Sequence, residues 1–577
     1  KGWAEAWLHV GMAPVSWWRV RHHLMQGVKV DFALTASNTA EEVTYSLASG
    51  KLPDGVKLVK DKKSKVTSIT GVPTKAGEFN VLVQAKAGKT VGTTEAFSFH
   101  VKPLALCAGT FNGVLEHDSE SAEVTGMGEL SSVAFTASEK GALSAKVQIA
   151  GKSYTFKATG YDRVEKDEEW DGETLYVKLT QVQKIGKASY TNALDLTVWY
   201  DELNWEGKAM LGSAAEATLT MSALSTDKAY AGERVWNGGL YRDNTKLAAM
   251  VADEADFVGY YTMALCPPEG TDSKVAPAGN GYLTLTVDAK GKVKVAGKLA
   301  DGTSLSGSVV AALSISGGVC DAGTPVLLVP YYYAKSTSLF GGTIALKKLA
   351  DGSIVVDSGR RMVWNNDAVT ATYGGTAGFA LEAIPTGGWY DKLVNLQRYY
   401  LDNRFWFDVS DELPEEILSA GYKFSAFALP NDLKNLDVTL TGDVPSVAKK
   451  SLVKVTGSKT LYDLGLSVNP WDVKISFKRV TGILSGSLSV WTEKNDGTAQ
   501  TEIKSLKHEG VLLLSRDQET LGPLTESAWT AGYYLVPTTL PKVGAKGTRK
   551  WTCSLPFNVL TEDMGEPQWS DYEGLGN

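Results

Sequence analysis

The order of turns and strands between Tyr45 and Gly88 constrains the fold of this chain most. The segment holds two proline-containing turns, Leu52-Pro53-Asp54-Gly55 and Gly71-Val72-Pro73-Thr74, in which proline presets φ and glycine accepts a positive φ. Apolar residues between and after the turns follow a two-residue period, at Val56, Leu58, Val66, Ile69, Phe79, Val81 and Val83. Such a period is typical of strands that bury one face. The segment therefore predicts a small β-sandwich.

This succession of motifs, LPxG followed by GxPT and then aG-x-[FY]-x-V-x-V, resembles an Ig-like family of bacterial extracellular proteins over roughly residues 28 to 102. The resemblance implies a cadherin-like or Ig-like spacer or adhesion module. It brings no catalytic residues, because a fold of this kind does not specify an activity. On this ground we expect the protein to be extracellular or at the cell surface.

At 577 residues the chain is too long for one hydrophobic core, and its length alone predicts about three or four domains. Hydrophobic residues make up 43% and charged residues 21%, with 58 glycines but only 19 prolines, which is typical of a folded, turn-rich β protein. The net charge of −7 is modest and both signs are interspersed, so we expect no nucleic-acid partner. No apolar run approaches the roughly 20 residues that cross a bilayer, so we expect no transmembrane segment.

A unit of one opening strand, a glycine-flanked turn and three further strands occurs twice. The first copy begins at Gly109 and the second at Gly259. Dipeptides suited to tight hairpins join the later strands, at Lys140-Gly141 and Ala150-Gly151 in the first copy and at Lys290-Gly291 and Asp301-Gly302 in the second. Because turn chemistry and alternation align over about two dozen residues, we interpret the copies as a duplication.

Further strand patterns follow the second copy. Residues Ile475 to Trp491 predict a hairpin that turns at Thr481-Gly482, and the segments HEGVLLLSR and AGYYLVP predict two short buried strands. From Gly259 to Pro537 the succession resembles β-barrel-like repeats of large bacterial secreted or surface proteins, and this resemblance implies no activity. Short helices are expected only within Trp389 to Phe405, where a linker strand is the alternative, and near Asp411.

These patterns together predict an all-β protein, in which an N-terminal Ig-like β-sandwich is followed by two related β-barrel or sandwich-type domains with few short helices. We divide the chain into a Trp-rich arm, the Ig-like sandwich, a first β-rich repeat domain and the two halves of a second repeat domain. Their residues are 1–27, 28–103, 104–256, 257–400 and 401–577.

Four cysteines occur, at Cys107, Cys266, Cys320 and Cys553, and none forms a CxxC pair, which argues against zinc ribbons and thioredoxin chemistry. An even number of cysteines in a chain that resembles extracellular modules favours disulfides, and three pairings are open. Cys266 and Cys320 fall within one repeat unit, so we predict that these two pair. Isolated buried thiols are the alternative, and the pairing of Cys107 and Cys553 stays unassigned.

The chain has no HExxH, GxSxG or GxxxxGK(S/T) motif, so carboxylates are the remaining catalytic option. An acidic cluster that includes Asp167, Glu169 and Asp171 surrounds Trp170. These carboxylates are weak candidate ligands for Ca²⁺, since the EF-hand spacing is missing, and an aromatic ring beside acidic groups also suits a sugar. A solvated loop between strands is the structural alternative. We expect no other cofactor.

Two further aromatic groups are candidate binding surfaces. Trp199 and Trp205 lie near acidic residues and, with Trp170, form the candidate glycan-binding set. A third group joins Tyr331, Tyr332 and Tyr333 to Trp389 and Tyr390. Aromatic rings on a β surface stack on sugars or anchor protein partners, but alternation places about half of them in the core.

The first residues form a Trp-rich arm, Gly2 to Met25, with Trp3, Trp7, Trp17 and Trp18 among histidines and arginines. The arm lacks the charged start, aliphatic centre and small-residue exit of a typical signal peptide. Exposed aromatics favour interfaces, so we predict that the arm makes subunit contacts in an assembly. The alternative is that it packs on its own Ig-like module.

We therefore expect a non-enzymatic extracellular structural or adhesive protein that self-associates as a subunit of a surface layer or filament. The alternative is a glycan-binding surface protein that uses aromatic platforms. A carboxylate-based glycan-active enzyme comes third.

Overall fold

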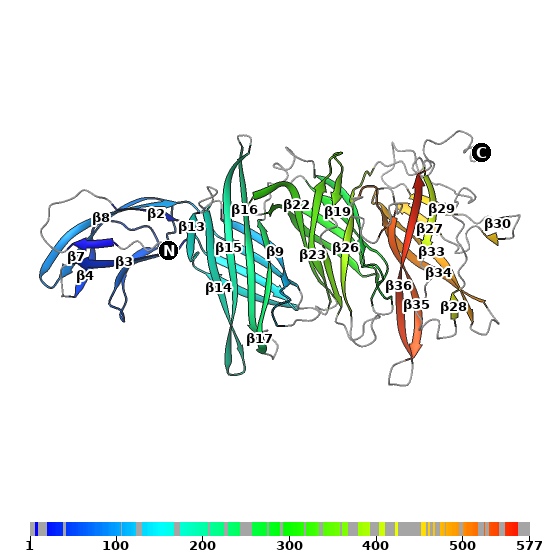
Figure 1. Ribbon diagram of the computed structural model, residues 1–577, viewed down its shortest axis with the longest axis horizontal. Coiled ribbons are helices and arrows are strands. Elements are labelled where there is room, and N and C mark those ends of the chain that lie inside the picture. The colour runs from blue at the N-terminus through cyan, green and yellow to red at the C-terminus, as the bar shows by residue number, and fades with distance from the viewer. Residues whose placement is uncertain are drawn as a thin grey trace. The chain divides into compact units, whose positions relative to one another are not determined.

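The computed structural model describes part of the chain, in 26 ranges or single residues. They are 6–9, 20–37, 42–104, 107–122, 130–166, 173–205, 208–223, 229–242, 257–273, 276–288, 292–316, 319–333, 338–357, 361–366, 379–392, 403–409, 422–424, 452–456, 460–461, 466–467, 474–478, 480–494, 500–516, 524, 530–541 and 548–563. The described residues form strands and turns with no helix (Figure 1), which confirms the predicted all-β class. The helix expected within Trp389 to Phe405 is replaced in part by the strand β27, and Asp411 lies outside the described residues.

The N-terminal module is a sandwich of two four-stranded sheets. One sheet has the order β1 (Ala6–His9), β3 (Val30–Ser37), β6 (Thr67–Gly71) and β5 (Val56–Lys60). The other has the order β2 (Val20–Met25), β8 (Thr90–Lys102), β7 (Gly77–Ala87) and β4 (Val43–Gly50). Alternate apolar residues from both sheets, among them Ile69, Val83 and Phe99, fill the space between the sheets. The predicted β-sandwich is confirmed.

The two predicted turns of this module have different conformations. In the first, Val56 N donates to Pro53 O at 2.9 Å. Gly55, the third residue of this turn, has a φ of 91°, which glycine adopts without a steric cost. The second segment is extended and pairs with the first, since Thr74 N donates to Asp54 O at 2.7 Å. Val66, expected in the core, is 41% exposed because it lies outside the strand pairing at the tip of the β5–β6 hairpin.

Nine strands follow the sandwich in a sheet that closes on itself. Their order is β12 (Lys152–Ala158), β11 (Leu143–Ile149), β10 (Leu130–Ala137), β9 (Gly109–His117), β17 (Ala229–Arg242), β16 (Lys208–Ala223), β15 (Ala188–Trp205), β14 (Glu173–Ile185) and β13 (Arg163–Lys166). Pairing of β12 with β14 closes eight of the strands into a barrel. Every second residue of β11 is buried, and such residues fill the barrel together with Phe135 and Trp236.

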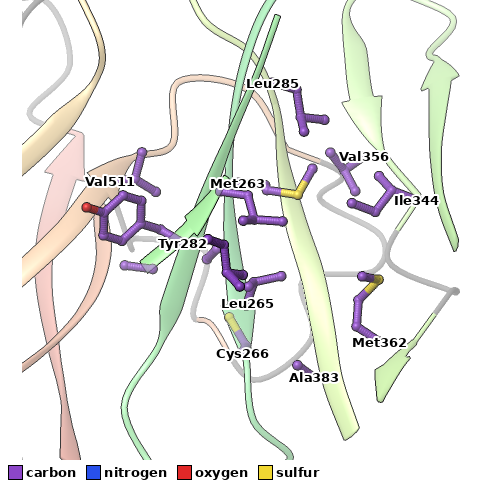
Figure 2. Packing of buried hydrophobic residues seen from close by; sticks show 14 of the residues in the cluster. Met263, Leu265, Cys266, Tyr282, Leu285, Ile344, Val356, Met362, Ala383 and Val511 are labelled. Carbon is purple, nitrogen blue, oxygen red and sulfur yellow. The ribbon is translucent and has the colours of Figure 1, made fainter. Parts of the chain in front are cut away.

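A second barrel has the same construction. Its strands run in the order β18 (Gly259–Cys266), β19 (Gly281–Val287), β20 (Lys292–Lys298), β21 (Ser304–Ser316), β22 (Val319–Tyr333), β23 (Ser338–Lys348), β24 (Ile354–Val356), β26 (Phe379–Trp389) and β25 (Met362–Asn366). Pairing of β18 with β26 closes the ring. Figure 2 shows Met263 and Leu265 of β18 gathered with Ile344, Val356 and Met362 in its buried cluster. Each strand from β9 to β12 thus has a counterpart from β18 to β21, as the predicted duplication requires.

The C-terminal part is an antiparallel sheet. Its order is β27 (Asn403–Val409), β36 (Thr548–Asp563), β35 (Thr530–Pro541), β34 (Gln500–Leu512), β33 (Ile483–Lys494), β32 (Lys474–Lys478) and β29 (Leu452–Thr456), with β28 (Tyr422–Phe424) on β33. The strands β30 (Thr460–Leu461) and β31 (Leu466–Ser467) pair separately. The predicted hairpin at Thr481-Gly482 is confirmed, since β32 and β33 pair and Gly482 N donates to Lys478 O at 2.8 Å.

The contacts divide the chain into two compact units. One unit is Lys1–Asp243 with Ile315–Cys320, and the other is Asn244–Ser314 with Asp321–Asn577. The first unit holds the sandwich and the first barrel, and the second holds most of the second barrel and the C-terminal sheet. No helix in the described residues is long and apolar enough to cross a membrane.

Candidate functional site

The acidic loop lies outside the described residues from Asp167 to Asp171, and so does Trp170. Its two flanks are described and form ion pairs. Arg163 Nε lies 2.8 Å from Glu165 Oε1, and Lys102 Nζ lies 3.0 Å from Glu173 Oε1. Within the described part of the chain, no three His, Cys, Asp or Glu side chains gather as metal ligands would. A Ca²⁺ site in the loop therefore stays a prediction.

The aromatic groups have different outcomes. Trp199 and Trp205 lie on β15, opposite Thr174 and Lys208 of the neighbouring strands, and their side chains lie outside the described residues, so their role in glycan binding stays a prediction. In the third group, the side chains of Tyr331, Tyr332 and Tyr333 on β22 are likewise not described. Trp389 packs against the buried cluster of the second barrel, with its ring edge-on to Tyr261 at 5.7 Å, and Tyr390 is buried. These last two aromatics are core residues.

The structure does not show the predicted disulfide. Cys266 is fully buried and is not bonded to another described cysteine, and burial raises the pKa of its thiol well above the usual range, which disfavours the nucleophilic thiolate. Its predicted partner Cys320 lies on β22, and the side chains of Cys320 and of Cys553 on β36 lie outside the described residues. Cys107 is buried in the first unit. The pairing of Cys266 with Cys320 stays a prediction that non-reducing peptide mapping decides.

The described parts of the Trp-rich arm pack on their own module. The strand β1, which contains Trp7, pairs in parallel with β3, and β2 pairs in parallel with β8. This is the alternative that the sequence left open. Trp3, Trp17 and Trp18 lie outside the described residues, as does the side chain of Trp7, so a role of these tryptophans in assembly stays a prediction.

The arm also supplies a buried histidine to the sandwich. The ring of His22 lies 4.7 Å from that of Phe32 on β3 and 5.5 Å from that of Phe99 on β8, between ring centroids. Its Nε2 atom is buried and has no hydrogen-bond partner among the described residues. Burial lowers the pKa of His22, because an apolar surrounding disfavours the charged ring.

The first unit contains a joint between the sandwich and the first barrel, formed around residues 25–29, 102–104, 107 and 160–162. Met25 and Val28 of the sandwich belong to the same buried cluster as Phe135 and Tyr161 of the barrel. Residues at this end of the sandwich thus pack into the apolar core of the barrel, beside the sandwich's own core. Interfaces between domains of one chain are commonly polar and permit relative motion, whereas apolar interfaces restrict it.

Backbone hydrogen bonds run across this joint in both directions. Tyr161 N donates to Gly27 O, and Lys29 N donates to Tyr161 O, each at 2.8 Å. A parallel bridge links Val28 and Tyr161. An ion pair flanks these bonds, with Lys29 Nζ 2.5 Å from Asp162 Oδ1. The pattern is that of an isolated parallel bridge, whose two hydrogen bonds and flanking ion pair fix direction as well as distance.

Two glycines let the backbones meet in the joint. Gly27 has a φ of 79° and Gly141 a φ of 91°, and a Cβ atom at Gly141 would lie 2.2 Å from the Cα of Gly27. No other residue fits this contact without a shift of the main chain. The sequence identified Gly141 only as a hairpin residue, and no local signal pairs it with Gly27, because the contact exists only in the folded unit.

In the second unit, three polar side chains form a clamp between the second barrel and the C-terminal sheet. Lys298 Nζ of β20 lies 2.6 Å from Glu509 Oε1 of β34, and the Tyr282 hydroxyl of β19 donates to Glu509 Oε2 at 3.3 Å. Burial, and next the Glu509 charge, raise the pKa of Tyr282 well above its usual range, so its hydroxyl stays a donor at neutral pH. The clamp was not predicted, because Glu509 lies more than 200 residues from Lys298 and Tyr282 in sequence.

Further buried groups surround the clamp. Tyr533 of β35 is buried, and burial followed by the charge of Glu509 raises its pKa. Burial also raises the pKa of Asp301, whose Oδ1 accepts a hydrogen bond from Thr303 N at 2.8 Å. Direct bonds reinforce the contact between barrel and sheet, since the Thr262 hydroxyl donates to Leu512 O at 2.5 Å. With Glu509 committed to a lysine and a tyrosine, this arrangement holds two sheets together.

Residues 22–102 match the family model described as Putative Ig domain. No curated protein and no solved structure matches the chain. The matched residues coincide with the strands from β2 to β8, which build both sheets of the sandwich apart from β1. The N-terminal module of this chain is therefore an Ig-like domain.

Proposed function

We propose that this chain is a non-enzymatic structural and adhesive protein of the bacterial cell surface, in which the Ig-like domain is the adhesive module and the barrels are its support. The observation that carries the proposal is the joint between the sandwich and the first barrel. Apolar residues of the sandwich that pack into the barrel core, together with a bonded backbone, hold the module in one orientation, whereas a module on a flexible linker would move freely. A fixed orientation suits a protein that transmits load or presents a surface.

The filled interior of the barrels also supports this proposal. Eight strands leave room for little more than side chains, and in the first barrel Phe111, Phe135, Phe156 and Trp236 take that room. Small-molecule sites need a concave pocket with convergent polar groups. A barrel packed in this way serves as a rigid body, and its outer surfaces are the parts that meet partners.

Assembly into a layer or filament is the second part of the proposal. In the Ig-like domain β4 is the last strand of its sheet, and it is exposed along most of its length, with Leu47 42% exposed. A strand at an edge offers unpaired backbone groups to another chain. Edge pairing between copies that does not close into a ring generates a filament.

Electron microscopy of the purified chain, with surface biotinylation of intact producing cells, tests the proposal. We expect biotinylated protein and ordered polymers. Leu47→Lys should shorten the polymers, because a charge on β4 opposes edge pairing, whereas Val182→Lys, at a 57% exposed site on β14, should not. Protein that is inaccessible to biotin and monomeric at all concentrations would refute the proposal.

Two alternatives have their own tests. Glycan binding by aromatic platforms predicts that Trp199→Ala and Trp205→Ala abolish a glycan-array signal without a change in melting temperature. Glycan hydrolysis by the acidic loop predicts that Asp167→Asn or Glu169→Gln abolishes a measured activity.

A further inference from the structure

The Ig-like domain differs in charge from the rest of the chain. Residues 22–102 contain 11 lysines against seven Asp and Glu residues, a net charge of +4 within a chain of net charge −7. Six of these lysines fall between Lys51 and Lys65, together with only two acidic residues. This segment forms the turn before β5, where Lys51 pairs with Asp54, the strand β5 and the turn into β6, so the other five lysines lie on one hairpin.

The turn of this hairpin is held in one conformation by its own aspartate. Asp61 Oδ1 accepts hydrogen bonds from Lys63 N at 2.8 Å and from Ser64 N at 2.7 Å, and these bonds lower the pKa of Asp61. Asp61 N also donates to Val66 O at 2.8 Å, and Lys65 takes a left-handed conformation with a φ of 62°. The turn therefore presents its lysines on a fixed backbone.

The lysines at the tip are available to a partner. Residues 59–66 are all exposed. Lys60 pairs with Glu42, but within the described part of the chain Lys57, Lys62, Lys63 and Lys65 form no ion pair. Val59 and Val66, at 38% and 41% exposure, lie beside them. A clustered, unpaired set of ammonium groups is the electrostatic footprint of a polyanion site.

The chemistry of the hairpin selects among polyanions. No aromatic residue lies between Lys51 and Thr70, and single-stranded nucleic acids are bound by stacking of bases on aromatic rings. Membrane surfaces are bound by apolar faces with Trp, Phe or Leu that enter the lipid, and two valines are a small face. Carboxylate or sulfate groups along a sugar chain need only spaced positive charges.

We propose that the β5–β6 hairpin of the Ig-like domain binds a linear anionic polysaccharide through Lys57, Lys62, Lys63 and Lys65. This inference deepens the adhesive part of the proposed function, since it names the adhesive surface and the class of its partner. Lysines on the edge strand β5 also discourage β-pairing with other chains, which is an alternative reason for their presence. The binding experiment described next separates this protection against aggregation from polysaccharide binding.

The test is binding of the full chain to heparin, a linear sulfated polysaccharide, with neutral dextran of equal length as the reference. We expect binding to heparin alone, and weaker binding as salt rises, because each neutralised anionic group releases a counterion. The triple variant Lys62→Gln, Lys63→Gln, Lys65→Gln should lose affinity on the order of 100-fold, from about fivefold per lysine near an anionic surface, and show a shallower salt dependence.

A matched variant, Lys86→Gln, Lys89→Gln, Lys146→Gln, removes the same charge from exposed sites elsewhere in the first unit and should retain its affinity. Circular dichroism must show both variants folded. Absence of heparin binding at low salt, an equal loss in both variants, or tighter binding to duplex DNA than to heparin would each overturn the inference. Heparin binding by a chain that fails the microscopy and biotinylation tests would leave the inference standing and remove the proposed function.

Discussion

The contact between Gly27 and Gly141 offers the sharpest perturbation of the joint. In Gly141→Ala the new methyl group meets the Cα of Gly27 at 2.2 Å, far inside the usual carbon–carbon separation of about 3.5–4.0 Å. A left-handed backbone costs a non-glycine residue roughly 1–2 kcal/mol, and overpacking costs about 1–3 kcal/mol more. We therefore expect a local loss of about 2–5 kcal/mol.

Gly186→Ala is the matched control. Gly186 also has a positive φ, 60°, but no atom lies within 4 Å of the place a Cβ would occupy. This variant should cost only the backbone component, roughly 1–2 kcal/mol, and only at the hairpin between β14 and β15. The difference between the two variants isolates the contact across the joint.

Hydrogen exchange of the intact chain measures these effects locally, which suits a chain of several domains whose unfolding is not two-state. Peptides that cover residues 24–29 and 159–163 should exchange at least about tenfold faster in Gly141→Ala and unchanged in Gly186→Ala. Equal exchange at these peptides in the two variants would refute the assignment of Gly27 and Gly141 to a close joint.

Three further predictions concern single side chains. Glu509→Gln should destabilise the second unit by about 1–3 kcal/mol in calorimetry, because it leaves the Lys298 charge without its partner. The control Glu382→Gln, in an exposed ion pair, should have almost no effect on stability. Equal effects of the two variants would show that the clamp is not stabilising. Burial lowers the pKa of His22 in the folded state, so the stability of the Ig-like domain should fall as pH drops below about 6.5. His22→Phe should remove this acid sensitivity. An equal loss of stability at low pH in the variant would contradict the prediction. Burial raises the pKa of Asp301, so the ionised carboxylate lowers the stability of the folded state above the pKa of the unfolded state. Asp301→Asn should therefore raise the melting temperature at pH 7 but not at pH 3. An unchanged or lower melting temperature at pH 7 would contradict this prediction.

Features that depend on a few neighbouring residues were predictable from the sequence. The turn at Pro53-Asp54-Gly55, the hairpins at Gly141 and Gly302 and the alternation of β11 all follow from local chemistry, and they were sufficient for the fold class and the repeat. The location of Trp389 was not predictable from local patterns, because an aromatic residue in a strand suits a surface platform and a core equally well. Only the packing of the barrel decides between the two.

Features that depend on distant pairs were not predictable. Glu509 has an ordinary sequence context, and its role arises only because β34 lies against β19 and β20 in the folded unit. The joint was not predictable for the same reason, since Gly27 and Tyr161 are far apart in sequence and form their hydrogen bond only in the folded unit. The basic hairpin was also not predicted, because charges of both signs are interspersed along the chain and only the fold places this run of lysines on one exposed hairpin.

The central claim is that the Ig-like domain is mounted rigidly on the first barrel. Spin labels on Lys89→Cys, at the β7–β8 turn, and Lys187→Cys, at the β14–β15 turn, report it directly through pulsed electron–electron double resonance. Both positions are exposed, and labelling of the unsubstituted chain provides the background from its own cysteines. A rigid joint predicts a single narrow distance distribution. A broad distribution, or several distances, would contradict the claim.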